Sequence, residues 1–127
     1  MMRVLLKSKL HRVTVTRTEL HYEGSCAVDE ALLEAADLRE YERVDIYNVN
    51  TGQRFSTYVV KAPRGSGTVC VMGAAARLAS VGDRLIVAAY ASFDEAEMAA
   101  FKPRVVLVDE KNRIVEVKSS SSGLSGA

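Results

Sequence analysis

Cysteine is scarce in this sequence. Its 127 residues include only Cys26 and Cys70, so one disulfide bridge is the most that the chain can form. With 48% hydrophobic residues the composition is that of a globular protein, and a chain of this length buries about two thirds of its unfolded surface. We therefore expect a folded domain without disulfides, in a reducing cytoplasm, and the composition excludes whole-chain disorder.

Net charge and clusters of charge are also lacking. Seventeen Lys and Arg side chains are matched by sixteen Asp and Glu side chains, and the basic residues are scattered along the chain. Because binding to polyanions depends on a basic surface, neither nucleic acid nor an anionic membrane surface is an expected partner.

Long hydrophobic runs are absent as well. The longest one, Leu85–Phe93, has about half the length of a transmembrane helix and contains Ser92. Basic residues interrupt any signal-peptide core near the start of the chain: Arg3, Lys7, Lys9 and Arg12. No membrane association is expected.

Short strand patterns separated by turn signals are what the sequence does contain. Alternating or continuous apolar residues predict six or seven short strands: around Val13–Val15, around Val44–Ile46, and over 53–61, 68–72, 84–91, 104–108 and 113–117. Two or three short helices are predicted: after a cap at Asp29, over Gly73–Ala76, and over Asp94–Phe101 before Pro103. The expected fold class is mainly β with short helices, and the regular strand spacing suggests a closed barrel.

Composition changes only at the C-terminal end of the sequence. Residues 119–127 are rich in Ser and Gly, and Leu124 is apolar. We expect a disordered tail there, after a single domain over residues 1–118. No internal repeat is present.

Several polar groups are candidates for sites, but each has a simpler interpretation. His11 and His21 are ten residues apart and distant from both cysteines, so no metal-ligand spacing is present. Cys26 has no neighbouring base, which favours a small buried thiol. The loop Arg64–Gly67 lacks the lysine and the full glycine pattern of a phosphate loop, which favours a plain turn.

Two further segments carry groups suited to chemistry. In Glu23–Cys26 a glycine precedes a serine, and glycine can adopt backbone conformations that expose its carbonyl to the neighbouring hydroxyl. In Arg54–Tyr58 a guanidinium and a phenol share one face of a strand, whereas Thr57 points the other way. Taken alone, these residues indicate only a turn and an exposed amphipathic strand.

Four segments together resemble the aspartate 1-decarboxylase family, whose members depend on a pyruvoyl group. They follow the family's order and spacing: Lys9–Arg12, Leu20–Ala27, Arg54–Tyr58 and Gly73–Ala76. The resemblance extends from about Arg3 to Val117. It implies a double-psi β-barrel and a cytoplasmic homotetramer with active sites between neighbouring subunits. At such an interface, Thr57 can contribute to a site although it lies on the other face of its strand.

The resemblance also implies an inactive proenzyme that processes itself. Ser25 attacks the Gly24 carbonyl, and elimination across the resulting ester releases residues 1–24, the β chain. Residues 25–127 form the α chain, in which Ser25 has become a covalent pyruvoyl group; no metal is implied. Thr57 hydrogen-bonds the Gly24 carbonyl during this step. A spontaneous cleavage and one that needs a maturation factor both remain open.

The implied reaction converts L-aspartate to β-alanine and CO2 for pantothenate and coenzyme A biosynthesis. The pyruvoyl ketone condenses with the substrate amine and takes up the electrons left when CO2 departs. Tyr58 is the implied proton donor, and Arg54 is the implied carboxylate-binding residue. The other implied substrate-binding residues are Lys9, Tyr22, Thr57, Gly73, Ala74 and Ala75.

Three positions depart from the family pattern. Met72 stands where the family usually has Asn, so a thioether replaces an amide that could hydrogen-bond the cleavage site or the substrate. Pro63 replaces an acidic residue and Arg77 replaces a common His, both at positions that we interpret as peripheral. Two alternatives remain open: a homologue defective in processing, and a binding module built on a similar small barrel.

Overall fold

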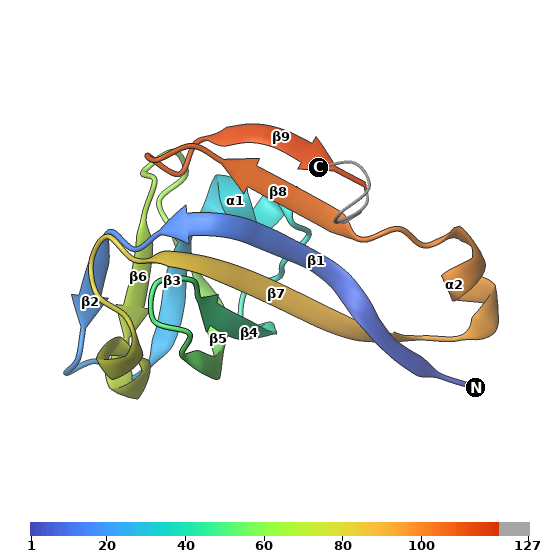
Figure 1. Ribbon diagram of the computed structural model, residues 1–127, viewed down its shortest axis with the longest axis horizontal. Coiled ribbons are helices and arrows are strands. Elements are labelled where there is room, and N and C mark those ends of the chain that lie inside the picture. Colours follow the sequence, from blue (N-terminus) through green and yellow to red (C-terminus); the bar gives the residue numbers. More distant parts are fainter. Residues whose placement is uncertain (120–127) are drawn as a thin grey trace.

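The computed structural model describes residues 1–119 and confirms a mainly β chain with short helices (Figure 1). Within this range the strands are β1 (Arg3–Thr14), β2 (Arg17–Glu19), β3 (Ser25–Asp29), β4 (Arg43–Asn48), β5 (Arg54–Ala62), β6 (Val69–Met72), β7 (Arg84–Phe93), β8 (Arg104–Val108) and β9 (Ile114–Lys118). The helical segments are α1 (Glu30–Ala35), the 3-10 helix η1 (Gly73–Leu78) and α2 (Glu95–Ala100).

The nine strands described within residues 1–119 form one mixed sheet, in the order β2-β6-β3-β5-β4-β7-β1-β8-β9. Parallel pairs join β1 to β8, β2 to β6 and β3 to β5, and the other neighbours are antiparallel. No ladder among the described residues joins β2 to β9, so the sheet is barrel-like but not closed. The expectation of a closed barrel is corrected to this extent.

β1 and β7 form a long antiparallel ribbon through the molecule, with α2 at its outer tip (Figure 1). Asp94 caps α2 through a capping box with Glu97, in which each side chain accepts a hydrogen bond from the other residue's backbone N–H. Both the helix and its cap agree with the sequence pattern.

The predicted number of strands is too low. The strands expected from residue 44 onward are present, and so are the three helical segments, with Asp29 as the cap of α1. β2 and β3 were not predicted: β2 has three residues, and β3 is a short segment between a glycine turn and the Asp29 cap. Ser119 is exposed, and residues 120–127 of the expected tail lie outside the described residues.

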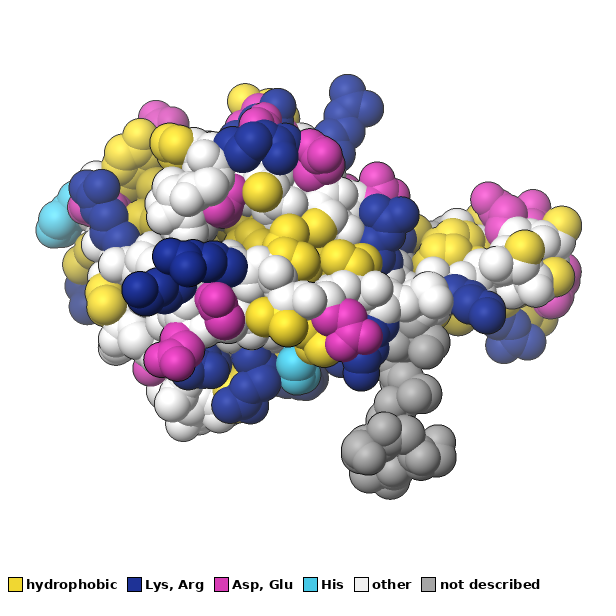
Figure 2. All heavy atoms as spheres, turned by 90° about the horizontal axis from the view of Figure 1, so that it is seen from above, with side chains coloured by type: hydrophobic (Ala, Val, Ile, Leu, Met, Phe, Trp, Pro, Cys, Tyr) yellow, Lys and Arg dark blue, Asp and Glu magenta, His cyan; other side chains and the backbone are white. Residues whose placement is uncertain are grey.

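Charged side chains of both signs are interspersed on the face of the molecule seen from above, with hydrophobic side chains exposed between them (Figure 2). This distribution agrees with the balanced numbers of acidic and basic residues in the sequence. Such a composition does not favour a large positive surface that would attract a polyanion. None of the helices within residues 1–119 combines the length and the hydropathy of a membrane-crossing segment.

The core lies beneath the sheet and contains one of the cysteines. Its largest fully buried side chains include Leu10, Leu32, Ile46 and Leu85. Cys26 and Cys70 are both free and buried. Burial, with a smaller contribution from the neighbouring Cys70, raises the pKa of the Cys26 thiol to about 12, so this thiol stays protonated and unreactive at neutral pH.

The loop that resembles a phosphate loop is bound by a carboxylate of the chain itself. Asp29 accepts hydrogen bonds from the backbone N–H groups of Gly65 at 3.0 Å and Gly67 at 2.9 Å, and it also accepts one from Ala31 at 2.9 Å. The buried carboxylate therefore caps α1 and fixes the loop between β5 and β6. The interpretation of this segment as a turn is confirmed.

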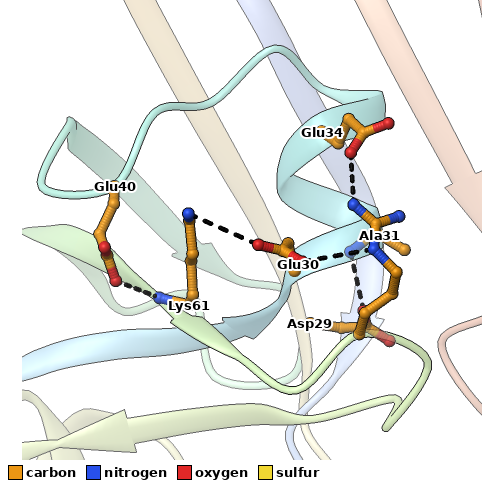
Figure 3. A network of polar contacts seen from close by, with 7 residues as sticks. Asp29, Glu30, Ala31, Glu34, Glu40 and Lys61 are labelled. Atoms are coloured by element: carbon orange, nitrogen blue, oxygen red, sulfur yellow. Dashed lines mark hydrogen bonds and ion pairs between the residues drawn. The ribbon is translucent and has the colours of Figure 1, made fainter.

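Ion pairs on the outside of α1 connect the helix to the end of β5 (Figure 3). Lys61 Nζ lies 3.5 Å from a carboxylate oxygen of Glu30, and the Lys61 backbone N–H donates to Glu40 at 2.9 Å. Arg64 pairs with both Glu30 and Glu34. Because these side chains are at least partly exposed, each pair contributes little stability alone, and the buried Asp29 contacts carry the connection.

Asn112, in the turn between β8 and β9, ties three distant segments together. Its side-chain oxygen accepts from the Thr14 backbone N–H at 2.7 Å, and its amide donates to the carbonyls of Thr14 and Gly67, both at 2.8 Å. Asn112 is buried and has a φ of +61°, a conformation that asparagine tolerates better than most residues. The end of β1, from which the chain continues to β2 and β3, is held by these bonds.

Replacement of Asn112 by alanine is expected to destabilise the fold by about 3 kcal/mol, because three buried backbone groups lose their partners. The measurement is urea unfolding followed by circular dichroism. Glu110→Ala, at an exposed position in the same turn, serves as the control and is expected to change stability by less than about 0.5 kcal/mol. Equal effects of the two substitutions would contradict the role assigned to Asn112.

Candidate active site

The bond between Gly24 and Ser25 has an unusual backbone conformation. The φ angle is +105° at Gly24 and +104° at Ser25, in the region that favours glycine. A serine in this region carries strain of about 1–3 kcal/mol, which the surrounding structure must hold. Ser25 begins β3, pairs with Met72 of β6, and exposes only 4% of its surface. The glycine–serine pair singled out in the sequence is therefore a buried, strained link.

Gly73, the first residue of η1, lies directly against this link. A Cβ atom at Gly73 would stand 2.5 Å from the Gly24 Cα and 2.7 Å from the Gly24 nitrogen, and φ at Gly73 is +73°. Both facts require glycine at this position. The next two residues, Ala74 and Ala75, are exposed and half-buried respectively. The small-residue segment predicted to approach a ligand thus begins in direct contact with the backbone of Gly24.

The sheet register places Tyr58 beside Ser25. Cys26 of β3 pairs with Val59 of β5 in the parallel ladder, so the two preceding residues, Ser25 and Tyr58, are neighbours across these strands. Cys26 and Val59 are both fully buried, and side chains alternate along a strand, so Ser25 and Tyr58 belong to the opposite face of the sheet. The Tyr58 side chain is accessible there, with 39% of its surface exposed.

The residues of β5 alternate as the sequence predicts. Arg54, Ser56 and Tyr58 are exposed on one face, whereas Phe55 and Thr57 are half-buried on the other. The register places Thr57 opposite the buried Val44 of β4. Within one chain, Thr57 and Tyr58 therefore lie on opposite faces of the sheet.

Arg54 is supported by two tyrosines from neighbouring strands. The guanidinium carbon of Arg54 lies 4.0 Å from the centre of the Tyr47 ring, and the hydroxyls of Tyr47 and Tyr90 are 2.8 Å apart. The hydrogen bond that the Tyr47 hydroxyl forms with Tyr90, followed by burial, raises the pKa of the Tyr47 phenol to about 12. Neither tyrosine is identifiable from the sequence as part of a site, because their contact depends on the registers of β4, β5 and β7.

A polar cluster separates Arg54 from Tyr58 on this face. The Ser56 hydroxyl donates to Asp45 at 2.7 Å and accepts from Arg43 at 3.4 Å. Lys9 belongs to the same row of the sheet, because it pairs with Ala88 of β7, which in turn pairs with Asp45. Lys9 therefore lies three strands away from the Arg54 and Tyr58 strand, on the face that these residues share.

The two histidines lie apart from each other. Burial, and then the positive charges of Lys9, Arg12 and Lys118, lower the pKa of His11, which favours its neutral form. His21 is exposed in the turn that precedes Gly24. Within residues 1–119, no three His, Cys, Asp or Glu side chains are grouped closely enough to hold a metal ion.

The predicted site residues fall into two groups within one chain. One group lies near the position where β3 and β5 pair, and it contains Gly24, Ser25, Tyr58 and Gly73. The carbonyl of the exposed Tyr22 is also close to Gly73. Arg54 is four residues along β5 from Tyr58, about 13 Å at the usual strand rise. Its guanidinium stacks on a residue of β4, which lies on the side of β5 away from β3.

Comparisons with known proteins identify the family of the chain. Residues 1–115 match the family profile described as aspartate decarboxylase. The aspartate 1-decarboxylase of Methylobacillus flagellatus is 66% identical over 114 residues, which cover 90% of each chain. Those of Bordetella pertussis and Cupriavidus necator are 57% and 56% identical, over 93% of this chain and 97% and 98% of theirs. The chain therefore belongs to the aspartate decarboxylase family, a family of carboxy-lyases.

Proposed function

We propose that this chain cleaves itself between Gly24 and Ser25 and then decarboxylates L-aspartate to β-alanine and CO2. The product would serve pantothenate and coenzyme A biosynthesis in the cytoplasm. The observation that carries the proposal is a buried serine at a φ of +104°, preceded by a glycine at +105°, in a member of the aspartate decarboxylase family. Strain at one specific peptide link is typical of a reacting site rather than of an ordinary turn.

Cleavage uses groups of the chain itself. Ser25 Oγ bonds to the Gly24 carbonyl carbon as the peptide C–N bond breaks, which gives an ester and a free amine at residue 25. Elimination then breaks the Oγ–Cβ bond, frees the Gly24 carboxylate, and leaves dehydroalanine at residue 25. Water hydrolyses this group to a pyruvoyl group and ammonia. The products are residues 1–24 and a pyruvoyl-capped chain of residues 25–127. Residues 1–24 and 25–118 together would form the single domain.

The surroundings of Ser25 fit this conversion. A Cβ atom at Gly24 would meet nothing within 4 Å, so there is free space beside this residue, whereas Gly73 packs against its Cα and its nitrogen. The hydroxyl of Thr57 is suited to hydrogen-bond the Gly24 carbonyl oxygen as negative charge develops on it. Thr57 lies on the half-buried face of β5, opposite the face that carries Tyr58. An active site at an interface between chains could use residues from both faces.

The pyruvoyl group supplies a ketone that condenses with the amine of aspartate and takes up the electrons released with CO2. The residues of the chain bind and orient the substrate around it. Arg54 presents a planar fork of N–H donors to a substrate carboxylate, and Lys9 adds positive charge on the same face. Tyr58, next to residue 25 in the sheet register, would donate its phenolic proton to the α-carbon of the substrate.

The remaining binding residues surround the same link. Gly73, Ala74 and Ala75 have side chains small enough for their backbone N–H groups to approach a ligand. Tyr22 has 62% of its surface exposed and its carbonyl lies near Gly73, so its ring is available to line the site.

The separation of the two groups supports active sites between chains, as in the homotetramer that we propose. The guanidinium of Arg54 leans away from Ser25 of its own chain, which favours a site that combines Arg54 of one chain with Ser25 of another. Large side chains that a neighbour could cover are exposed on β1, β4 and β7 or just before them: Val4, Tyr41 and Tyr90. A maturation factor that assists cleavage is compatible with this assembly.

Met72 favours a second candidate, a homologue that processes itself poorly. Met72 is buried opposite Ser25 in the β3–β6 ladder, and its thioether has no N–H to donate to the Gly24 carbonyl. The nucleophile and the strained backbone are nevertheless both present. We therefore favour an active enzyme, and direct observation of the cleavage products separates the two candidates.

Ser25→Ala is expected to abolish cleavage, because alanine has no oxygen to attack the Gly24 carbonyl. Mass spectrometry of the purified, denatured protein should show two fragments, 1–24 and 25–127, for the unsubstituted chain and one intact chain for the variant. The fragment that begins at residue 25 should carry the mass of a pyruvoyl group. An unsubstituted chain that stays intact after prolonged warm incubation would contradict autonomous processing.

Gly73→Ala is expected to slow cleavage by at least about tenfold, because its Cβ would collide with Gly24 and displace the strained link. The control is Gly82→Ala, at a φ of +95° with nothing within 4 Å of the added Cβ. Both variants bear the strain of a positive φ, but only Gly73→Ala has the collision. The rate of fragment appearance is the measurement, and equal rates in the two variants would remove the role of the Gly73 contact.

Arg54→Lys is expected to raise the KM for aspartate by about tenfold, because an ammonium cannot form the bidentate contact of a guanidinium. Arg43→Lys, on the same face of the sheet, is the control and should leave the KM near its original value. Steady-state release of CO2 from the cleaved enzymes provides the measurement. Similar KM values for both variants would argue against Arg54 as the carboxylate-binding residue.

A further inference from the structure

Three side chains from three adjacent strands form a continuous stack on the exposed face of the sheet. Arg54 of β5 and Tyr47 of β4 are direct partners in the antiparallel ladder, and the guanidinium carbon lies 4.0 Å from the centre of the ring. Tyr90 of β7 contacts the far end of Tyr47, with 2.8 Å between the two hydroxyl oxygens. The Arg54 guanidinium therefore contacts the Tyr47 ring, and the Tyr47 hydroxyl in turn contacts the Tyr90 hydroxyl.

We propose that Tyr47 and Tyr90 are positioning residues that hold the Arg54 guanidinium in place for a substrate carboxylate. This inference rests on the proposed role of Arg54 and adds two residues that act through it. Tyr47 provides the surface on which the guanidinium rests, and Tyr90 holds the Tyr47 ring in its orientation.

Stacking leaves the donors of Arg54 available. A guanidinium placed over an aromatic face is attracted through that face, while its N–H groups lie in the plane of the fork and remain directed outward. Within residues 1–119, Arg54 has no carboxylate partner within ion-pair distance, although other arginines on the surface do. Within the described part of the chain, the guanidinium of Arg54 is therefore available to an anion from outside.

The Tyr47 phenol next to Arg54 is protonated at neutral pH, and its raised pKa of about 12 extends that state to higher pH. The hydrogen bond that Tyr47 forms with Tyr90 is the largest contribution to the raised pKa of Tyr47, followed by burial, by the charge of Tyr90 and by Asp45; Arg54 acts in the opposite direction. An ionised phenol beside Arg54 would compete with the substrate carboxylate for the guanidinium. A phenol that remains protonated supports the cation without neutralising it.

Tyr90→Phe tests the proposal with the loss of one oxygen atom. In the cleaved enzyme, we expect the KM for aspartate to rise about threefold while kcat stays within about twofold, because binding is weakened and the proton donor is untouched. Tyr47→Phe retains the ring and should match Tyr90→Phe, whereas Tyr47→Leu removes the stack and should raise the KM further. The matched control is Ser92→Ala, which deletes an exposed hydroxyl two residues further along β7.

A second measurement does not depend on turnover. Succinate carries the two carboxylates of aspartate but no amine, and its Kd can be measured by calorimetry. In the Arg54→Lys background, adding Tyr90→Phe should change the Kd by less than about 1.5-fold, because a residue that acts through the guanidinium has no effect once the guanidinium is absent. In the unsubstituted background the same change should weaken succinate binding about threefold.

The outcomes separate this inference from the proposed function. If Arg54→Lys weakens binding but Tyr90→Phe leaves both the KM and the Kd unchanged, or if the two effects add fully, the positioning role is overturned and the role of Arg54 stands. If Arg54→Lys itself has no effect on either constant, the carboxylate-binding role fails, and the positioning role fails with it.

Discussion

The contact between Gly73 and Gly24 is the constraint on which the site depends. Two backbone segments approach so closely that a single added carbon at Gly73 would lie 2.5 Å from the Gly24 Cα. The contact holds Gly24 and Ser25 at positive φ angles, and Ser25 enters β3 directly from that conformation. The ladders of β3 with β6 and β5 then bring Met72 and Tyr58 alongside. Strain, nucleophile and candidate proton donor are therefore positioned by one close approach of backbone.

The sheet gives the rest of the site its rigidity. Alternation along β5 assigns the guanidinium and the phenol to the exposed face and turns Thr57 toward the other. Strand spacing also keeps Arg54 too far from Ser25 of its own chain for both to contact one small substrate easily. The same regular geometry that fixes each group precisely enough for chemistry thus favours a site completed by a neighbouring chain.

Much of the fold could be predicted from local signals, whereas contacts between strands could not. Asp29 and Asp94 mark their helices because a side-chain oxygen caps the first turn, and the β4–β5 hairpin follows from alternation around a glycine turn. β3 escaped prediction because five residues between a glycine and a helix cap show no clear alternation. The contact of Tyr47 with Tyr90 joins residues 43 positions apart, and no local pattern specifies that register.

The candidate site was predicted in a different way. The residues around Ser25, Tyr58 and Arg54 were identified from their order and spacing in a family, and the observed geometry is compatible with the roles proposed for them. The role of Asp29 as the internal ligand of the Gly65–Gly67 loop was not apparent, because one of its backbone partners precedes β5 in the sequence and the other two lie between β5 and β6. A short carboxylate side chain near a glycine-rich loop can bind the backbone N–H groups of that loop and cap a helix at the same time.

The place of β1 in the sheet has a consequence for the cleaved protein. β1 lies between β7 and β8 and pairs with both, and Leu10 and Val13 carry it into the core. A break after Gly24 would therefore leave residues 1–24 as a permanent non-covalent subunit rather than a discarded leader. Unfolding would then separate two polypeptides, so recovery of the native state would become a bimolecular association whose yield depends on protein concentration. Before cleavage, a single chain could form the whole sheet on refolding. After cleavage, residues 1–24 would have to associate with the other chain before β1 could take its place in the sheet.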